Sequence, residues 1–597
     1  MEKEELKIRF KELSKILLNG LNDEGFWTGE LSSSALGVAV AVAALHFHNP
    51  EENKTEIQRG LSWLSNNLNS DGSYGDTPES PGNISTSLLV YAALNLYAKE
   101  DESLKELQSN IAGYLQKNSI NINSDQVADA ILYHYKKDYT FSVPILTMCA
   151  LCGIPEKGGF KKIPQLPFEL ALMPQKFYRL LNLSVVSYAI PALIAVGIVI
   201  FKNKKPGKFA QWLRSKAERK ALKILQNSMP ASGGFLEAIP LTAFVSLSLI
   251  NAGYGHLEVV DKGIAFLKRT QRKDGGWPID VDLSTWVTTL SIKALGHKKD
   301  EVLTSEQQER LMEHLKSIQN KIVHPFNGTS PGGWGWTNFT GSVPDGDDTP
   351  GAIMALLQLA PHHTIAEEIL VGGEWLLKLQ NNDGGFPTFS RGWGKLPFDQ
   401  SCADLTGHAF LAIATILNRY RKEIPSSQKR RFDKSLVKAT TYLQKHQRND
   451  GSWLPLWFGN QQEKNHENPV YGTARVLTYL SDAQSQLESN PKLSQKVRKL
   501  ISSGEKFLVN VQNTDGSWGG HKNIPGTIEE TSLAVSALQR EEFAKNRKAG
   551  FEWLDDYFKK EGLKAAPIGL YFASLWYDEK MYPLTAYLEA VVRSMNA

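Results

Sequence analysis

The sequence predicts an all-α protein made of two helical domains of comparable size. Three observations predict this fold class. A helix–turn–helix unit repeats along the chain, the segments after each turn have long apolar faces at helical spacing, and the alternating pattern of β-strands is hardly found anywhere. Helix pairs that repeat in this way stack into a solenoid or close into an α/α barrel.

Each repeat is a helix that ends in or near Gln, followed by a Gly-rich turn, an aromatic residue and a second helix. Asp-Gly in the turn permits a positive φ. The Gln side chain can cap free backbone groups at the helix end or tie one helix pair to the next. We therefore expect the aromatic residues to be structural. The six clear copies run from Gln226 to Phe235, Gln271 to Trp277, Gln319 to Trp334, Gln380 to Phe386, Gln447 to Trp453 and Gln512 to Trp518.

The composition limits the classes of function. The chain has 597 residues, 42% of them apolar, and a net charge of only +4, which gives no support to nucleic-acid binding. Three cysteines are too few for a disulfide framework and suit a reducing compartment. The opening segment MEKEELKIRFKELSKILLNGL is too charged for a signal peptide. It predicts an amphipathic helix that packs on the far domain.

One uncharged stretch, residues 183–201, approaches the length of a membrane span. It contains Pro191, and several lysines follow it. We interpret it as a buried helix followed by a basic loop, with a monotopic membrane contact nearby as the second interpretation.

Three aspartates in four residues, Asp345, Asp347 and Asp348, precede an apolar helix. A role at the helix N-terminus explains one or two of them, but three adjacent carboxylates repel one another. Burial and like charge raise the pKa of such a group. The cluster therefore favours a Brønsted acid that keeps its proton near neutral pH, as the protonation of an isolated alkene requires.

Asp404 and His408 begin another apolar helix. A cationic imidazole bonded to the acid would favour its conjugate base and so strengthen the acid. From spacing alone, His408 is better explained as a buried structural histidine. A carbocation would also need a dry wall of aromatic faces, and the chain is rich in aromatic residues, with 14 Trp.

These motifs together resemble the squalene–hopene cyclases, along nearly the whole chain. Asp345-x-Asp347-Asp348-Thr349 matches their D-x-D-D-T acid motif, and the Gln…Gly…Trp copies match their QW repeats. The resemblance implies two α/α barrels that share a cavity. Residues 18–297 would form one barrel, and residues 1–17 with 298–597 the catalytic barrel that carries the acid motif.

The resemblance also implies an activity. A linear triterpene, squalene or a related polyprene, would be cyclised through carbocations that end by deprotonation or water capture, with no cofactor and no metal. The implied partners are this hydrophobic polyprene, a membrane surface on the cytoplasmic side, and a second copy in a homodimer. No nucleic acid is expected.

The resemblance assigns roles position by position. Asp347 would donate the proton, Asp345 and Asp348 would tune it, His408 would polarise it, and Asp404 would support the network. The implied substrate-binding residues are Trp286, Trp336, Trp457, Tyr188, Tyr571 and Phe572.

Several departures from the family pattern indicate a cavity of different shape. Gly346 stands where Val is usual, Trp336 where Phe is usual, and Tyr188 in place of a Trp. The segment 202–234 is shorter than the family's membrane-dipping segment. A family cavity Tyr expected between Phe386 and Asp404 is not recognisable. The product can therefore differ from hopene, and oxidosqualene, diterpenoid and sesquarterpenoid substrates stay open.

Other classes fit less well. A class I terpene synthase needs the motif D-D-x-x-D. In this chain the pair Asp555-Asp556 begins such a pattern, but Lys559 stands where the last Asp belongs. A protein prenyltransferase β subunit needs zinc ligands, which Cys402, Asp404 and His408 match only superficially. A class II diterpene cyclase lacks such dense repeats. A non-catalytic helical-repeat binding protein would need neither the aspartates nor the aromatic wall.

Overall fold

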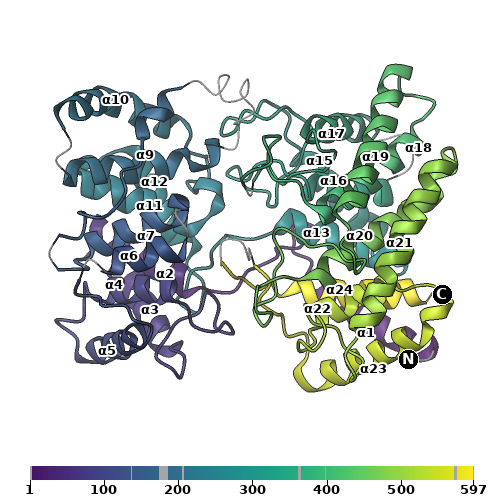
Figure 1. The fold of residues 1–597 in the computed structure, drawn as a ribbon, viewed down its shortest axis with the longest axis horizontal. Coiled ribbons are helices and arrows are strands. Elements are labelled where there is room, and N and C mark those ends of the chain that lie inside the picture. The colour runs from purple at the N-terminus through teal and green to yellow at the C-terminus, as the bar shows by residue number, and fades with distance from the viewer. Residues whose placement is uncertain are drawn as a thin grey trace.

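The computed structural model describes residues 3–124, 126–135, 138–156, 158–173, 186–204, 207–360, 365–396, 398–569 and 575–595. In these ranges the chain is helical, with isolated β-bridges but no extended strand, which confirms the predicted fold class. Figure 1 shows two lobes, one purple to teal and the other green to yellow.

The first lobe is an α/α barrel. In the described part of the chain, five inner helices contact one another in sequence, and the last returns to the first, which closes the ring. The inner helices are α2 (Ala35–His48), α4 (Ile84–Leu94), α7 (Tyr139–Leu151), α9 (Val186–Asn203) and α11 (Ile239–Leu249). The outer helices are α3 (Lys54–Asn66), α5 (Glu102–Lys117), α6 (Gln126–His134), α10 (Lys208–Asn227) and α12 (Glu258–Thr270).

The second lobe is a larger ring of the same kind. Six inner helices of the described residues contact one another in order, and α24 closes the ring on α13. The inner helices are α13 (Ser284–Leu295), α16 (Asp348–Leu359), α18 (Ala403–Arg419), α20 (Pro469–Ala483), α22 (Ile528–Ala537) and α24 (Met581–Ser594). The outer helices are α1 (Lys3–Asn19), α15 (Ser305–Ser317), α17 (Ala366–Leu379), α19 (Ser426–His446), α21 (Pro491–Val511) and α23 (Ala544–Glu561).

Shorter helical turns fill the connections. They are η1 (Phe168–Leu172), η2 (Phe235–Glu237), η3 (Ile250–Tyr254), η4 (Gly296–Lys298), α14 (Lys299–Val302), η5 (Gln484–Leu487) and η6 (Glu541–Phe543).

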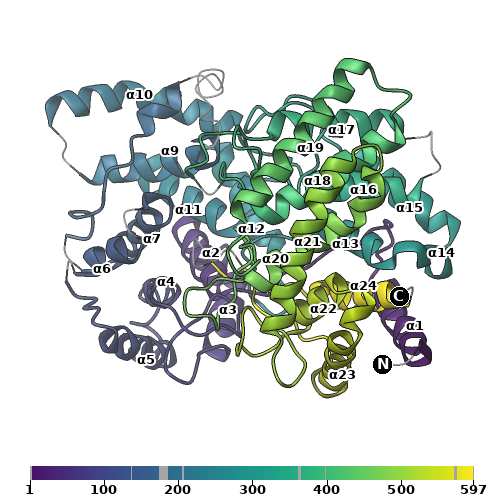
Figure 2. The same ribbon diagram turned by 45° about the vertical axis from the view of Figure 1, so that its right-hand side comes forward.

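The N-terminal helix α1 packs in the second barrel, as its amphipathic sequence predicts. It contacts α24, and Figures 1 and 2 show it beside α23 and α24, far along the chain. The turn after α1 resembles the other repeats. The Trp27 indole donates to the Leu17 carbonyl of its own outer helix, and the Trp27 backbone N–H donates to the Thr288 hydroxyl of the inner helix α13.

The buried apolar residues form two cores. One extends from Ala35 to Trp277, and the other joins the N-terminal residues to those from Trp286 onward. Phe326 and Val343, from the loop before α16, lie in the first core and tie the barrels together. Along the chain, the first core gives way to the second between Trp277 and Trp286, so α13 packs with the second barrel. The predicted domain limits themselves stay a prediction.

The repeated Gln ties neighbouring helix pairs, as its position at the helix end predicts. The Gln380 amide donates to the Gly384 carbonyl in its own turn and to the Ser435 carbonyl in the next outer helix, at 2.8 and 3.1 Å. Gln271, Gln319, Gln447 and Gln512 make the same two bonds. The indoles of Trp277, Trp334, Trp453 and Trp518 are fully buried and bond back to their own outer helices, which supports the structural role expected of them.

The apolar stretch around Pro191 forms the inner helix α9. Its residues from Ile194 to Ile200 are largely buried, as we interpreted them from the sequence. Within the described ranges, no helix combines the length and the apolarity needed to span a membrane.

Candidate active site

A second hydrogen bond of the repeat places the candidate site. In five of the six clear copies, the backbone N–H of the turn aromatic donates to a Thr hydroxyl near the start of an inner helix. Trp334 donates to Thr349 at 3.0 Å, and Phe386 donates to Thr406 at 2.9 Å. The Thr of the D-x-D-D-T motif is therefore a structural residue of the scaffold.

We call the residue two positions before this hydroxyl residue the rim residue, because it lies at the N-terminal end of its inner helix. In the second barrel, the hydroxyl partners of Trp27, Trp334, Phe386, Trp453 and Trp518 define the rim residues. These rim residues are Trp286, Asp347, Asp404, Tyr471 and Glu529. One position of the repeat thus gathers an acid, two further carboxyls and two aromatics at one end of the barrel.

Asp347 and His408 form an acid pair. Asp347 Oδ1 and His408 Nδ1 lie 2.6 Å apart, although they come from different inner helices. The Asp347 side chain keeps 18% of its surface exposed, whereas the His408 side chain keeps only 4%. Of the three motif aspartates, Asp347 alone is more than marginally accessible, since Asp345 and Asp348 are buried.

Asp345 and Asp348 hold the loop that presents Asp347. Asp345 Oδ1 accepts the backbone N–H groups of Asp347 and Asp348, at 2.9 and 2.8 Å. Burial raises the pKa of Asp345 to about 7, although these hydrogen bonds oppose the rise. Burial, with the nearby negative charges of Asp345 and Asp347, raises the pKa of Asp348 well above its usual value. The motif therefore retains protons near neutral pH.

The surroundings of His408 favour a neutral imidazole. Its ring stacks on Tyr479 at 4.3 Å between centroids and lies 6.2 Å from the ring of Trp286. Burial is the largest effect and lowers the pKa of His408, while the bond and charge of Asp347 act against it. The cationic imidazole expected from the sequence is therefore not the form that this environment favours.

Asp404 lies close to the acid pair but has a partner of its own. It accepts a hydrogen bond from the Cys402 thiol, and burial raises its pKa to about 6. Burial also raises the pKa of Cys402 well above its usual value. Cys402 is bonded to Asp404 and His408 to Asp347, and among the described residues no three His, Cys, Asp or Glu side chains are placed to hold a metal ion. Asp555 pairs with Arg9 and Lys559 instead of forming a magnesium motif.

Five aromatic side chains, which we call the aromatic cluster, pack beside the acid loop. They are Tyr188, Trp336, Phe389, Phe398 and Trp457, with ring centroids 5.1 to 5.8 Å apart. The cluster joins the barrels, because Tyr188 comes from α9 of the first. It also adjoins the acid, since the Gly346 N–H donates to the Thr388 carbonyl at 2.6 Å and Thr388 accepts from the Trp457 indole.

The structure brings most of the predicted residues together. Trp336, Trp457 and Tyr188 meet in the aromatic cluster, and Trp286 lies beside His408. Tyr571 and Phe572 lie outside the described residues.

Sequence reasoning missed other members of the site. Phe389 lies three residues after the repeat aromatic Phe386, in the stretch where no cavity Tyr was recognisable, and Phe398 joins it from a loop. Tyr471 and Glu529 could have been found by aligning the repeats on their threonines. Nothing in the sequence alone indicates that Tyr479 and Arg475 belong to the site.

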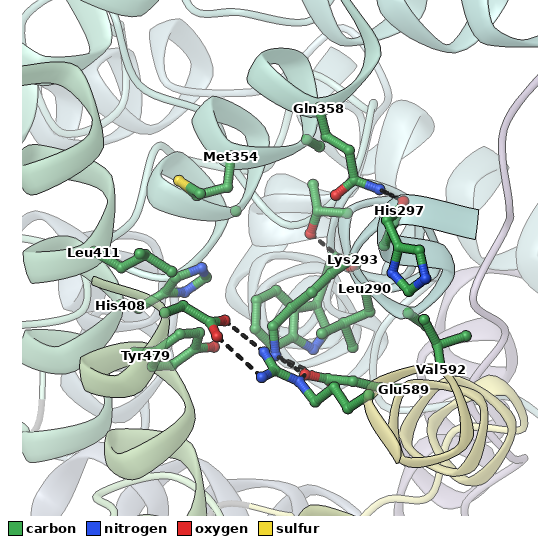
Figure 3. A pocket seen from close by; sticks show the side chains of 18 residues that line it. Leu290, Lys293, His297, Met354, Gln358, His408, Leu411, Tyr479, Glu589 and Val592 are labelled. Carbon is green, nitrogen blue, oxygen red and sulfur yellow. Dashed lines mark hydrogen bonds and ion pairs between the residues drawn. The ribbon is translucent and has the colours of Figure 1, made fainter. Parts of the chain in front are cut away.

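A cavity of about 230 Å³ lies inside the second barrel and has His408 in its lining. Trp286 is among its lining residues, with Lys293, His408, Tyr479 and Glu589, and Figure 3 labels the last four around the cavity. Asp347 does not line it, so this hollow adjoins the imidazole side of the acid pair. It is separate from the aromatic cluster.

Comparison with known families decides the relationship. Residues 283–562 match the sequence model of the squalene-hopene cyclase C-terminal domain, and residues 10–112 match that of the N-terminal domain. Together these matches cover well over half of the chain. The chain belongs to the squalene–hopene cyclase family.

Individual relatives of this family member are distant. Enfumafungin synthase efuA of Hormonema carpetanum is 24% identical over 89% of this chain and 44% of its own length. The squalene hopane cyclase afumA of Aspergillus fumigatus is 23% identical over 83% of this chain and 75% of its own. The chain thus spans less than half the length of the first relative.

Among solved structures, the type II terpene cyclase MstE from Scytonema is 16% identical, with a TM-score of 0.37. The aligned region covers 52% of this chain and 88% of that one. The family assignment therefore rests on the sequence matches.

Proposed function

We propose that this chain is a class II terpene cyclase. Asp347 protonates a terminal alkene of a linear polyprene, and the resulting carbocation closes into fused rings. The single observation that carries this proposal is the acid pair: a partly accessible carboxyl bonded to a buried imidazole, between two buried carboxyls and beside a cluster of five aromatic rings.

The geometry of the pair suits proton transfer to carbon. When His408 Nδ1–H donates to Asp347 Oδ1, the other oxygen is left to carry the proton toward the substrate. A hydrogen bond to the conjugate base strengthens the acid. The carboxylate left after transfer is stabilised where it forms, and this electrostatic preorganisation costs nothing at the moment of reaction.

The aromatic cluster supports the cationic steps. Aromatic faces stabilise carbocations electrostatically and do not react as nucleophiles as readily as water. Centroid separations of 5.1 to 5.8 Å mean that the rings contact one another. A polyprene must therefore part them, and the shape that they enclose around the chain sets ring number. Loss of a proton would end the reaction in an alkene, and water capture in an alcohol.

The substrate in this proposal is a linear polyprene. Squalene is the first candidate, and oxidosqualene, diterpenoid and sesquarterpenoid chains are the others. The test is incubation of the purified protein with each in detergent, with and without EDTA, followed by mass spectrometry. We expect a cyclic product from squalene that forms equally with EDTA. If every polyprene is recovered unchanged while the protein binds it, a non-catalytic binding protein becomes the better account.

We also propose that the protein takes its substrate from a membrane surface. The exposed face of α10 carries Phe209 and Trp212, which are 76% and 54% exposed, and Leu170 and Met173 from the adjoining η1 region are exposed beside it. Basic residues share the helix, and Lys216 Nζ lies 4.1 Å from the Trp212 ring centroid. Aromatic and basic side chains on one face suit an interfacial helix.

Sedimentation with anionic lipid vesicles tests the membrane contact. Wild type should sediment with the vesicles, and a Phe209→Ser, Trp212→Ser variant should remain largely in the supernatant. Lys548→Met, an exposed change on α23, serves as the control. Equal sedimentation of the double variant and wild type would exclude this face.

A further inference from the structure

A lysine lies inside the second barrel, behind the acid pair. Lys293 of α13 pairs with Glu589 of α24 at 2.8 Å, and its Nζ lies 5.1 Å from the Tyr479 ring centroid. Tyr479 in turn stacks on His408, with the two rings within 6° of parallel. Lys293 and His408 line the same cavity, whereas Asp347 does not (Figure 3). The lysine charge is therefore on the imidazole side of the pair.

A second buried cation comes from α20. The Arg475 side chain is buried, and its Nε donates to the Tyr471 hydroxyl at 3.3 Å. Its Cζ lies 5.4 Å from the Tyr471 ring centroid and 5.8 Å from that of Trp286, the ring beside His408. Among the described residues, no salt bridge holds Arg475, but the negative charges of Glu589 and Asp347 act on it. Its positive charge is therefore offset only in part.

Charged groups lie around His408 on α16, α18, α13 and α20. Asp347 faces it from α16, Asp404 lies one turn earlier on its own helix, and Lys293 and Arg475 lie on α13 and α20. Glu589 compensates Lys293 but also pairs with Arg593, which binds Asp482 at 2.9 Å. The interior of the barrel therefore keeps an excess of positive charge behind the imidazole.

We propose that Lys293 and Arg475 are positioning residues, whose two buried positive charges keep the imidazole of His408 neutral so that the proton of the acid pair stays on Asp347. This inference rests on the proposed function. The pair with one proton has two forms: protonated Asp347 with neutral His408, or ionised Asp347 with cationic His408. Only the first can protonate an alkene, and positive charge nearer to the imidazole favours it.

The electrostatics of the buried groups agree with this account. Burial lowers the pKa of His408, and the charges of Lys293 and Arg475 lower it further, against the effect of Asp347. Burial also lowers the pKa of Lys293 to about 8, although Glu589 opposes the change. Lys293 therefore keeps its charge at neutral pH and loses it as the pH rises through about 8.

The first test measures the charge on His408 without substrate. NMR of protein labelled at histidine Cε1, assigned with His408→Gln, gives its titration in wild type, Lys293→Met and Arg475→Met. We expect neutral His408 near pH 7 in wild type, and a pKa raised by about 1 in each charge-removing variant. Lys293→Arg and Arg475→Lys keep the charge and should titrate like wild type, as should Lys548→Met.

The second test is the pH dependence of turnover. In a variant that lacks one of the two cations, the single proton of the pair resides on His408, so Asp347 must take up a second proton before it can react. The basic limb of the rate profile should therefore move to lower pH, with about a tenfold loss of rate near pH 7. This shift is expected although the pKa of His408 itself rises. A merely structural role would lower the rate equally at every pH.

The outcomes separate the two proposals. If no polyprene is cyclised by wild type, the proposed function fails, while the NMR titration still reports on His408. If wild type cyclises its substrate but His408 titrates identically in wild type and folded Lys293→Met, the inference about the cations is wrong. Circular dichroism establishes folding, and Lys293→Met remains informative if Arg475→Met does not fold.

Discussion

The two barrels use the same hydrogen bond at the start of their inner helices. In the first barrel, Tyr74 N–H donates to Ser87 and Phe235 N–H to Thr242, both at 2.9 Å. In the second, Trp334 and Phe386 donate to Thr349 and Thr406 in the same way. The rim residues that these bonds define are Ser85 and Pro240 in the first barrel, but Asp347 and Asp404 in the second.

This difference shows how a repeat acquires chemistry. The scaffold of Gln, Gly, aromatic and Thr is common to both barrels and fixes where each rim side chain lies. Only the residue type at that position distinguishes an acid from a packing residue. The first barrel contributes Tyr188 to the aromatic cluster, whereas the second contributes the acid and its imidazole.

The largest expected effect separates the two rims. Asp347→Asn keeps the shape of the side chain but removes the transferable proton, so product formation should fall by at least about 10³-fold. The matched change in the first barrel, Ser85→Ala, should leave the rate within about twofold of wild type. Product is quantified by gas chromatography with mass spectrometry. Comparable losses in both variants would mean that the rims contribute through stability and not through acidity.

A smaller effect is expected in the aromatic cluster. Phe389→Leu removes one ring that faces the cations, so the rate should fall by about tenfold, with partly cyclised products appearing. Phe235→Leu, the same change in the first core, should lower the thermal midpoint and leave the product pattern unchanged. A wild-type product pattern from Phe389→Leu would exclude that ring from the substrate path.

The smallest effect concerns the shared scaffold. Thr242→Val and Thr349→Val each leave a buried backbone N–H without its hydroxyl acceptor, so each should lower the free energy of unfolding by about 1–3 kcal/mol. Only Thr349→Val should also slow turnover, because Thr349 fixes the helix start at which Asp347 lies. Denaturant unfolding and rate measurements on both variants check this. Unchanged stability in both would show that the bond is dispensable.

Much of this arrangement was predictable because it is local in sequence. The Gln-Gly-aromatic pattern predicted the helix pairs, and the amphipathic start predicted a helix, which α1 forms. The three aspartates marked the acid loop. In each case, the determining contacts involve residues near one another in the chain, or a motif with one physical explanation.

The remainder depends on contacts between distant segments. Phe398 and Tyr188 meet across the barrels, and no spacing indicates that meeting. Burial is the first cause of the lowered pKa of His408, and the charges of Lys293 and Arg475 from two other helices act in the same direction. A cationic imidazole was therefore a reasonable expectation from the motif alone, but not from the packed barrel.

Turnover in D₂O tests the central claim most directly. If Asp347 delivers a solvent-exchangeable proton to carbon, wild-type product formed in D₂O must carry one deuterium bonded to carbon. This C–D bond does not exchange when the product is returned to H₂O. The Asp347→Asn variant should form neither labelled nor unlabelled product. Cyclic product without deuterium, or labelled product at the wild-type rate from Asp347→Asn, would contradict the account.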